Sequence, residues 1–342
     1  MQRILKFLRA LFEVASKYLR VLLDWLELAM KYPRTLLVVA VTMAVLVGLG
    51  SNQMNSYYRD VAIDIGIAII LAVSLNLING HTGQFSLGHA GFMSVGAYVA
   101  AMTTLALQRS FGVDSLPWLF LPALIVGGVV AALTGWLVGM PSLRLRGDYL
   151  AIVTLGFGEI IRVVFQNVEA AGGASGLSGI PKLSGLAWTF GLAAVTVYVV
   201  GCLVKSTYGR GFIAVHDDEV AASSMGLNPT RYKVTAFVIG AFFAGIAGGL
   251  YSHHKTFISP QGFDFMKSFE VVVMVILGGM GRTAGVIVAA VVLTLLSEQL
   301  RSAAELRMIL YALLIIVLMI TRPQGLFNFE RKKKPLPAKS AP

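Results

Sequence analysis

Four ionisable residues lie inside otherwise apolar stretches of this 342-residue sequence: Asp64, Glu159, Arg162 and Glu270. A charge within a lipid bilayer costs about 2.5–3.5 kcal/mol on insertion scales, so each of them is a candidate for transport or binding. Glu159 and Arg162 are three residues apart on one helix face, which favours a structural pair first and a substrate contact second. Asp64 and Glu270 lie near the ends of their stretches, where water or headgroups solvate them, and are weaker candidates.

Signatures of enzymes are absent from the sequence. It has no GxxxxGK[ST] loop for ATP, the GFG run at 156–158 lacks the third glycine of a dinucleotide-binding turn, and its five histidines form no HExxH motif. The adjacent His253 and His254 are interpreted as polar loop residues. Cys202 is the single cysteine and has no partner for a disulfide or a metal. The chain is therefore expected to catalyse no reaction and to hold no metal or cofactor.

Two glycine-rich polar segments interrupt the apolar stretches. One spans residues 81–91 and the other residues 277–281, and both suit irregular backbone around a water-lined path. A tight turn between two membrane spans explains each segment equally well. The candidate residues for a translocation path are Asn76, Gln84, Ser86, His89, Glu159, Gly278 and Gly279.

The composition places these residues in a membrane protein. Hydrophobic residues make up 56% of the chain, charged residues 13%, and the mean hydropathy is +0.76. About a quarter of residues are charged in soluble proteins. Continuous apolar runs such as 36–50 and 187–204 favour helices over a porin-type barrel, whose strands alternate apolar and polar residues. The net charge of +11 is interpreted as a set of topology signals and not as a nucleic-acid surface.

The sequence predicts an all-α polytopic protein with about ten crossings, some of them short or broken. Because the stretch 268–297 is too long for one span and contains five breaking residues at 278–285, it is divided there. In this arrangement 20 of the 28 Lys and Arg residues lie on the inner side, so both termini are predicted to be cytoplasmic. The predicted crossings are 36–50, 61–79, 85–107, 118–140, 149–165, 186–204, 234–251, two from 268–297, and 308–320.

The two ends of the chain differ from the middle. Charged residues recur at helical spacing from position 3 to position 31, so residues 1–35 are predicted to form an amphipathic helix on the membrane surface, with a docking helix for a partner subunit as the alternative. This segment lacks the pattern of a cleaved signal peptide. Residues 36–326 form the predicted membrane domain, and 327–342 a disordered basic tail.

The loop 205–233 carries strong local signals for a short helix. Asp217, Asp218 and Glu219 supply an N-cap and an acidic first turn, residues 220–225 form under two turns, and Gly226 ends the helix. A second helix start follows at 228–229, where Asn precedes Pro. The sequence therefore predicts a short helix that projects from the membrane between two spans, with a solvated loop as the alternative.

Five blocks of sequence, in order, resemble the permease subunits of branched-chain amino-acid ABC importers, and specifically the M-type of the two paired permeases. The resemblance runs from about residue 70 to 326. It is carried by LNLINGHTGQFSLGHA at 75–90, LRGDYLAIVTLGFGEIIR at 145–162, the acidic run 217–219 with Ala221, Ala222 and Met225-Gly226, LGGMG at 277–281, and RPQGL at 322–326.

The resemblance implies a type II-like ABC importer permease that moves leucine, isoleucine or valine from periplasm to cytoplasm. It implies an H-type permease, two cytosolic ATPases that use ATP and Mg²⁺, and a periplasmic amino-acid-binding protein as partners, in a bacterial inner membrane. The residues implied to couple to an ATPase are Asp217, Asp218, Glu219, Ala221, Ala222 and Gly226. A urea or short-chain amide importer is the nearest alternative, and an ATP-independent secondary transporter is a more distant one.

Overall fold

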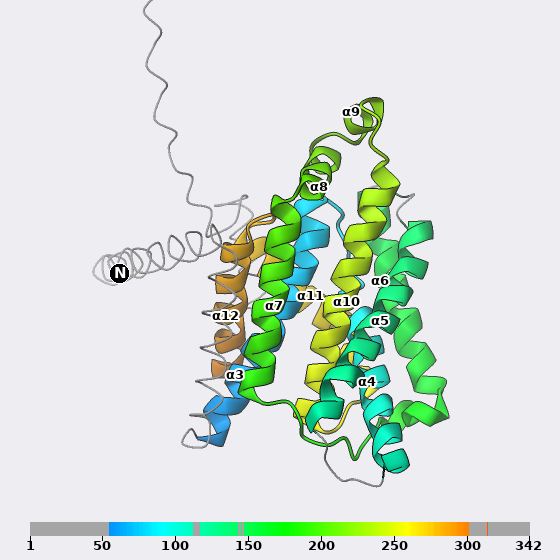
Figure 1. Cartoon of the computed structure of the whole chain (residues 1–342), viewed down its shortest axis with the longest axis vertical. Coiled ribbons are helices and arrows are strands. Elements are labelled where there is room, and N and C mark those ends of the chain that lie inside the picture. Colours follow the sequence, from blue (N-terminus) through cyan, green and yellow to red (C-terminus); the bar gives the residue numbers. More distant parts are fainter. Residues whose placement is uncertain (1–54, 112–116, 143–144, 146, 301–312, 314–342) are drawn as a thin grey trace, which may run out of the picture.

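The computed structural model describes residues 55–111, 117–142, 145, 147–300 and 313. Within these residues the main regular elements are helices, and the long helices pack side by side into one bundle (Figure 1). The long helices are α3 (Ser56–Asn76), α4 (His89–Phe111), α5 (Pro117–Ser142), α6 (Asp148–Asn167), α7 (Leu186–Lys205), α10 (Pro229–Lys255), α11 (Phe265–Gly278) and α12 (Thr283–Gln299). Shorter elements are the π-helix η2 (Leu77–His81), α8 (Thr207–Asp217), α9 (Glu219–Ser224), and the 3-10 turns η3 (Glu169–Ala171), η4 (Gly173–Ser175) and η5 (Pro260–Phe263).

Five helices of the described part are long and apolar enough to cross a membrane: Ser56–His81, His89–Ser110, Leu119–Ser142, Leu186–Lys205 and Pro229–Lys255. Each coincides with a predicted crossing, which confirms a polytopic all-α protein. Helix α6 matches the prediction for 149–165, but it carries Asp148, Glu159 and Arg162 within its 20 residues. The total of ten crossings stays a prediction.

The predicted division of 268–297 is confirmed. Helix α11 ends at Gly278, α12 begins at Thr283, and the turn between them passes through Gly279 and Gly281, whose φ angles are 90° and 79°. These φ values lie in the region that favours glycine, so glycine is what allows the chain to reverse here. The result is two short antiparallel helices in place of one long span.

Helix α4 begins four residues later than the predicted crossing at 85. The chain leaves α3 through the wide turn η2 and then runs without helix from Gly83 to Gly88. Two backbone N–H groups of this segment find acceptors in η2: the Gln84 N–H donates to the Ile78 carbonyl (3.1 Å), and the Ser86 N–H donates to Asn79 Oδ1 (3.2 Å). Irregular backbone at this depth needs such internal partners.

Helix α10 lies at the centre of the bundle and packs closely against α4 and α5. The small residues predicted to form its packing faces, Ala241, Ala244, Gly245, Gly248 and Gly249, are all buried. A Cβ at Gly248 would meet the Met93 carbonyl oxygen of α4, and one at Gly245 would lie 2.5 Å from Ala131 Cβ of α5. The prediction of close helix contacts through small residues is confirmed.

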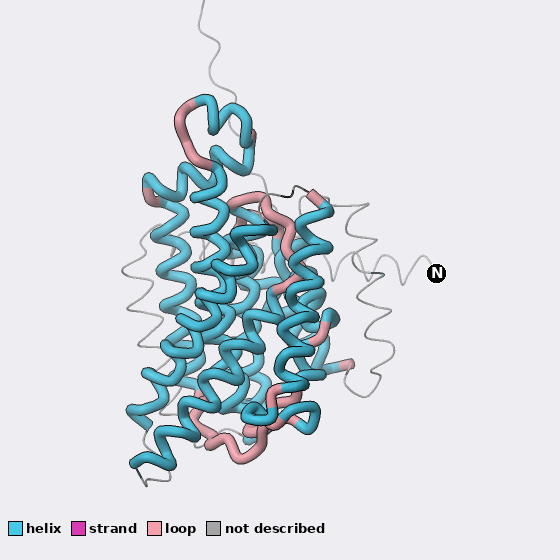
Figure 2. The backbone as a smooth tube through the Cα atoms, turned by 90° about the vertical axis from the view of Figure 1, so that its right-hand side faces the viewer, coloured by secondary structure: helices cyan, strands magenta, loops and turns pink. Residues whose placement is uncertain are grey.

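The two ends of the bundle differ (Figures 1 and 2). At one end α8 and α9 project beyond the long helices. At the other end the segment after η4 and the segment after α10 meet through an antiparallel bridge between Leu177 and Ile258, whose N–H groups donate to each other's carbonyls at 2.8 and 3.1 Å. The predicted amphipathic helix 1–35, the crossings 36–50 and 308–320, and the basic tail 327–342 lie outside the described residues.

Candidate functional site

The predicted short helix is present as α9. Asp218 caps it, because its Oδ1 accepts from the N–H groups of Val220 (2.8 Å) and Ala221 (3.0 Å). Gly226 follows the helix with a φ of 84°, and Asn228 caps α10 by accepting from the Arg231 N–H at 3.2 Å. The local signals that predicted this helix therefore act as expected.

An ion pair joins α9 to α10, and an aromatic cluster joins α8 to α10. Lys233 Nζ of α10 lies 2.9 Å from Glu219 Oε2, and the lysine side chain is only 10% exposed. The rings of Tyr208, Phe212 and Tyr232 pack together, with the Tyr208 and Tyr232 centroids 4.6 Å apart, and join α8 to the first turn of α10. Helices α8, α9 and α10 are thus connected to one another through α10.

The tip formed by α9 is exposed, including two large apolar side chains. Val220 is 64% exposed and Met225 is 84% exposed, whereas Ala222 packs inward at 5%. The other predicted coupling residues are distributed around the same tip: Asp217 ends α8, Asp218 caps α9, Glu219 pairs with Lys233, Ala221 is exposed, and Gly226 forms the turn.

The end of α3 and the turn η2, which precede the first polar segment, meet the second polar segment in the structure. Asn76 Oδ1 accepts from the Gly281 N–H at 2.9 Å, and a Cβ at Gly80 would collide with the same backbone nitrogen. Gly83 lies against α8, since a Cβ there would be 2.7 Å from His216 Nδ1. Contacts thus link α8 to the first polar segment, and the end of α3 with η2 to the turn between α11 and α12.

The other predicted path residues of the first segment are buried. His89 is fully buried, and its Nε2 lies 2.9 Å from Ser74 Oγ of α3. Gln84 is 2% exposed and its amide has no hydrogen-bond partner within the described part of the chain, and the same holds for the Ser86 hydroxyl. Gly278 packs against Val286 of α12, which explains why that position has no side chain.

Glu159 lies apart from these residues, on α6. Its Oε2 accepts from Arg162 at 2.7 Å, which confirms the predicted i, i+3 pair. The two side chains are 33% and 26% exposed.

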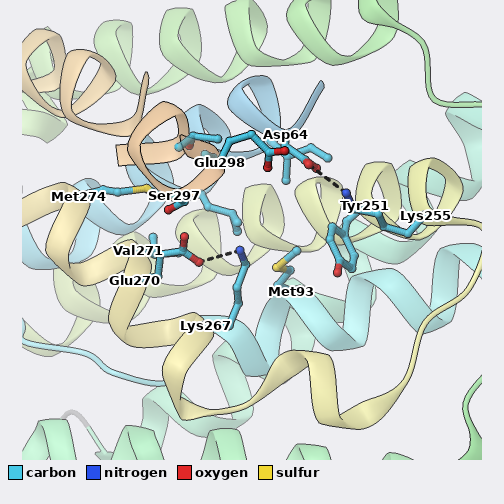
Figure 3. Close-up of a pocket in the computed structure, with 14 residues that line it drawn as sticks. Asp64, Met93, Tyr251, Lys255, Lys267, Glu270, Val271, Met274, Ser297 and Glu298 are labelled. Atoms are coloured by element: carbon cyan, nitrogen blue, oxygen red, sulfur yellow. Dashed lines mark hydrogen bonds and ion pairs between the residues drawn. The ribbon is translucent and has the colours of Figure 1, made fainter. Parts of the chain in front are cut away.

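A charged cavity of about 260 Å³ lies between α3, α10, α11 and α12 (Figure 3). Two ion pairs line it: Lys255 Nζ to Asp64 Oδ2, at 2.9 Å, and Lys267 Nζ to Glu270 Oε2, also at 2.9 Å. The first pair joins α10 to α3, and the second lies within α11. The residues that line the cavity are Asp64, Ile67, Ala68, Leu71, Met93, Tyr251, Lys255, Lys267, Glu270, Val271, Met274, Thr294, Ser297 and Glu298.

The residues that line this cavity are not prominent candidates in the sequence. Asp64 and Glu270 are the weaker of the ionisable candidates from the sequence, and Lys255 and Lys267 are not among those candidates. The signal that was available is the i, i+3 spacing of Lys267 and Glu270 at the start of an apolar helix.

The interpretation of His253 and His254 as loop residues is wrong. Both lie in the last turns of α10 and are buried, because α10 continues to Lys255. His253 Nε2 lies 2.9 Å from Thr104 Oγ1 of α4, and its ring meets Phe120 edge to face at 4.9 Å. His254 Nε2 lies 3.8 Å from Asp64 Oδ1, behind the charged cavity.

Comparison with known proteins places this bundle in one family. Residues 57–319 match the family described as "Branched-chain amino acid transport system / permease component". The chain is 39% identical to the high-affinity branched-chain amino acid transport system permease protein LivM of Salmonella typhimurium, over 86% of this chain and 74% of that protein. It is 39% identical to LivM of Escherichia coli over 80% and 70%, and 26% identical to LivH of Escherichia coli over 76% and 90%. No solved structure matches this chain.

The chain is a multi-pass membrane permease, a transport protein and not an enzyme. It belongs to the family of branched-chain amino acid transport system permease components, and within that family it is LivM-like.

Proposed function

We propose that this chain is the M-type permease subunit of an ATP-driven importer that moves leucine, isoleucine and valine into the cytoplasm of a bacterial cell. The observation that carries the proposal is α9, a capped and exposed helix held between α8 and α10 at one end of a membrane bundle. The similarity to LivM supports the substrate class. The bundle end that bears α9 is cytoplasmic in this proposal, as are both termini.

The energy for transport enters from partner subunits in this proposal. Two cytosolic ATPases bind and hydrolyse ATP with Mg²⁺, and one of them receives α9 with its exposed Val220 and Met225. A second, H-type permease completes the path, and the similarity of this chain to LivH fits a pair of related subunits. A periplasmic binding protein delivers the amino acid to the opposite face.

Closure of the ATPases on ATP moves α9 and, through the anchoring contacts described above, tilts α8 and α10. The contact of His216 with Gly83 and the bond from Gly281 to Asn76 support transmission to the two polar segments. We place Asn76, Gln84, Ser86, His89, Gly278 and Gly279 along this moving wall of the path, with Glu159 at its outer surface on α6.

The test is to purify the tagged chain from gently solubilised membranes of its own cells and to identify its companions by mass spectrometry. We expect a P-loop ATPase and a second permease of the same family in the complex. Recovery of the chain alone, together with ATP-independent movement of leucine into proteoliposomes, would contradict the proposal and favour a secondary transporter.

A further inference from the structure

The charged cavity lies in the half of the bundle that points away from α9. It is bounded by the middle turns of α3, by the first three turns of α11 and by the last turns of α10 and α12, whereas α9 adjoins the first turns of α10. If the end with α9 is cytoplasmic, the cavity lies in the outer half of the membrane. A solute that arrives from outside therefore meets this cavity before it meets the polar segments.

The charges of the cavity have both signs and come from several helices. Figure 3 shows the pairs Asp64–Lys255 and Lys267–Glu270 on different sides of one space, with Glu298 near Asp64. The lining thus holds two ammonium groups and three carboxylates within its described residues. Because each lysine has three N–H donors, it can keep its carboxylate partner and still donate to a ligand.

Beyond these charges, Tyr251, Thr294 and Ser297 contribute hydroxyl groups, and the other lining residues are apolar. Ile67 and Leu71 of α3, Met93 of α4, and Val271 and Met274 of α11 contribute aliphatic or thioether side chains. All of them except Ile67 are at most 3% exposed, so they are part of the packed core of the bundle. A small ligand that carries both charges and a branched aliphatic chain complements a lining of this composition.

We propose that this cavity binds the zwitterion of a free aliphatic α-amino acid, its carboxylate held by Lys255 and Lys267, its ammonium by Asp64 and Glu270, and its side chain against Ile67, Leu71 and Met274. The volume of about 260 Å³ is below the roughly 300–1,000 Å³ of pockets for drug-sized ligands, which suits a small metabolite. The proposal rests on the proposed function, because it assigns a binding site within this subunit to the imported substrate.

A ligand with only one charge fits the cavity poorly. An organic anion would pair with the two lysines and face the three carboxylates. An organic amine would pair with the carboxylates and face the two lysines. Like charges brought together in a partly desolvated site are strongly unfavourable. The cavity therefore selects for a molecule that carries both charges close together, as the α-carbon of an amino acid does.

The test is direct binding of radiolabelled L-leucine to the complete transporter in nanodiscs, without the binding protein. We expect saturable binding of leucine, and we expect valine and isoleucine to compete with it. Leucinamide, which lacks the carboxylate, and 4-methylpentanoate, which lacks the ammonium, should compete at least about tenfold more weakly, since each loses charge-assisted hydrogen bonds. These competitions use the unaltered protein, so they do not depend on whether a variant folds.

Variants localise the binding. We expect Asp64→Asn and Lys267→Gln each to weaken leucine binding about tenfold or more. The matched control is Lys182→Gln. It removes a lysine whose Nζ lies 3.5 Å from Asp60 Oδ1 and which does not line the cavity. Leucine binding to this variant should be unchanged. The exchange Asp64→Lys with Lys255→Asp restores an ion pair between α3 and α10 with reversed polarity. A structural role would be rescued by this exchange, whereas zwitterion binding would not.

Uptake measured with the same preparations separates the two proposals. Complexes that import leucine with ATP and the binding protein but show no saturable binding, or bind equally well in all variants, would overturn the cavity site and leave the importer intact. Equal competition by leucinamide or 4-methylpentanoate would also overturn it. Complexes that fail to import leucine would overturn the proposed function and the cavity site together.

Discussion

Gly226 shows how one residue links local backbone geometry to coupling. It adopts a φ of 84° directly after α9, and a Cβ at this position would meet no atom within 4 Å. Any effect of a substitution here therefore acts through the backbone and not through a steric collision. Left-handed backbone costs about 1–2 kcal/mol for most L-residues, and least for Asn among the common alternatives.

We expect Gly226→Val to uncouple ATP hydrolysis from transport, because the β-branched residue resists the turn that orients α9. Leucine uptake per ATP hydrolysed should fall several-fold in proteoliposomes that contain the complete transporter. Gly226→Asn is the matched control and should retain most of the coupling, since Asn tolerates this conformation. A Val variant with the uptake-to-hydrolysis ratio of the unaltered protein would show that α9 is not the coupling element.

The role of a residue can be predicted from the sequence when its partner lies nearby in the chain, and not when the partner is distant in sequence. Asp218 and Asn228 bond to N–H groups two or three residues along the chain, so their capping roles were predictable. Lys255 pairs with Asp64, which lies 191 residues away, and no local pattern reports such a partner. The charged cavity was missed for this reason.

At the scale of elements, α10 organises the bundle through its small residues. Gly248 faces the backbone of α4 closely enough that a Cβ would collide with the Met93 carbonyl oxygen and lie 2.8 Å from the Ala97 nitrogen. Backbone atoms of a packed helix cannot move aside as a flexible side chain can. The contact between the two helices therefore depends on the absence of a side chain at this position.

We expect Gly248→Ala to destabilise the protein by about 1–3 kcal/mol, because the added methyl group overpacks the interface of α10 and α4. Thermal unfolding of the purified protein in detergent should show a lower midpoint. Gly191→Ala in α7 is the control: its Cβ would meet nothing within 4 Å, and Ala is favoured over Gly in a helix by about 0.5–1 kcal/mol. Equal midpoints for the two variants would refute close packing at Gly248.

Elements were more predictable than their ends. Long apolar runs located α3, α5, α7 and α10, and the glycines after Leu277 located the break between α11 and α12. The late start of α4 was not predictable, because it depends on Asn79 and Ser86 bonding to each other across the non-helical segment. The burial of His253 was missed because Thr104, its partner, belongs to another helix.

At the scale of the whole molecule, the described bundle has two chemically distinct ends. One bears the exposed α9, fixed to α10 by the pair of Glu219 and Lys233. The half of the bundle away from α9 holds a cavity with paired charges and apolar side chains. The bond from Gly281 to Asn76 joins the turn between α11 and α12 to the end of α3. This difference between the two ends fits a protein that binds an amino acid at one end and is moved by a partner ATPase at the other.

The most direct test of an ATP-driven importer is leucine uptake by proteoliposomes that contain the complete transporter, with the binding protein outside and ATP and Mg²⁺ inside. We expect leucine to accumulate against its gradient only when ATP is hydrolysed, and not with a non-hydrolysable analogue. Accumulation of equal extent without ATP, driven by an ion gradient alone, would contradict the assignment of this chain as a permease powered by partner ATPases.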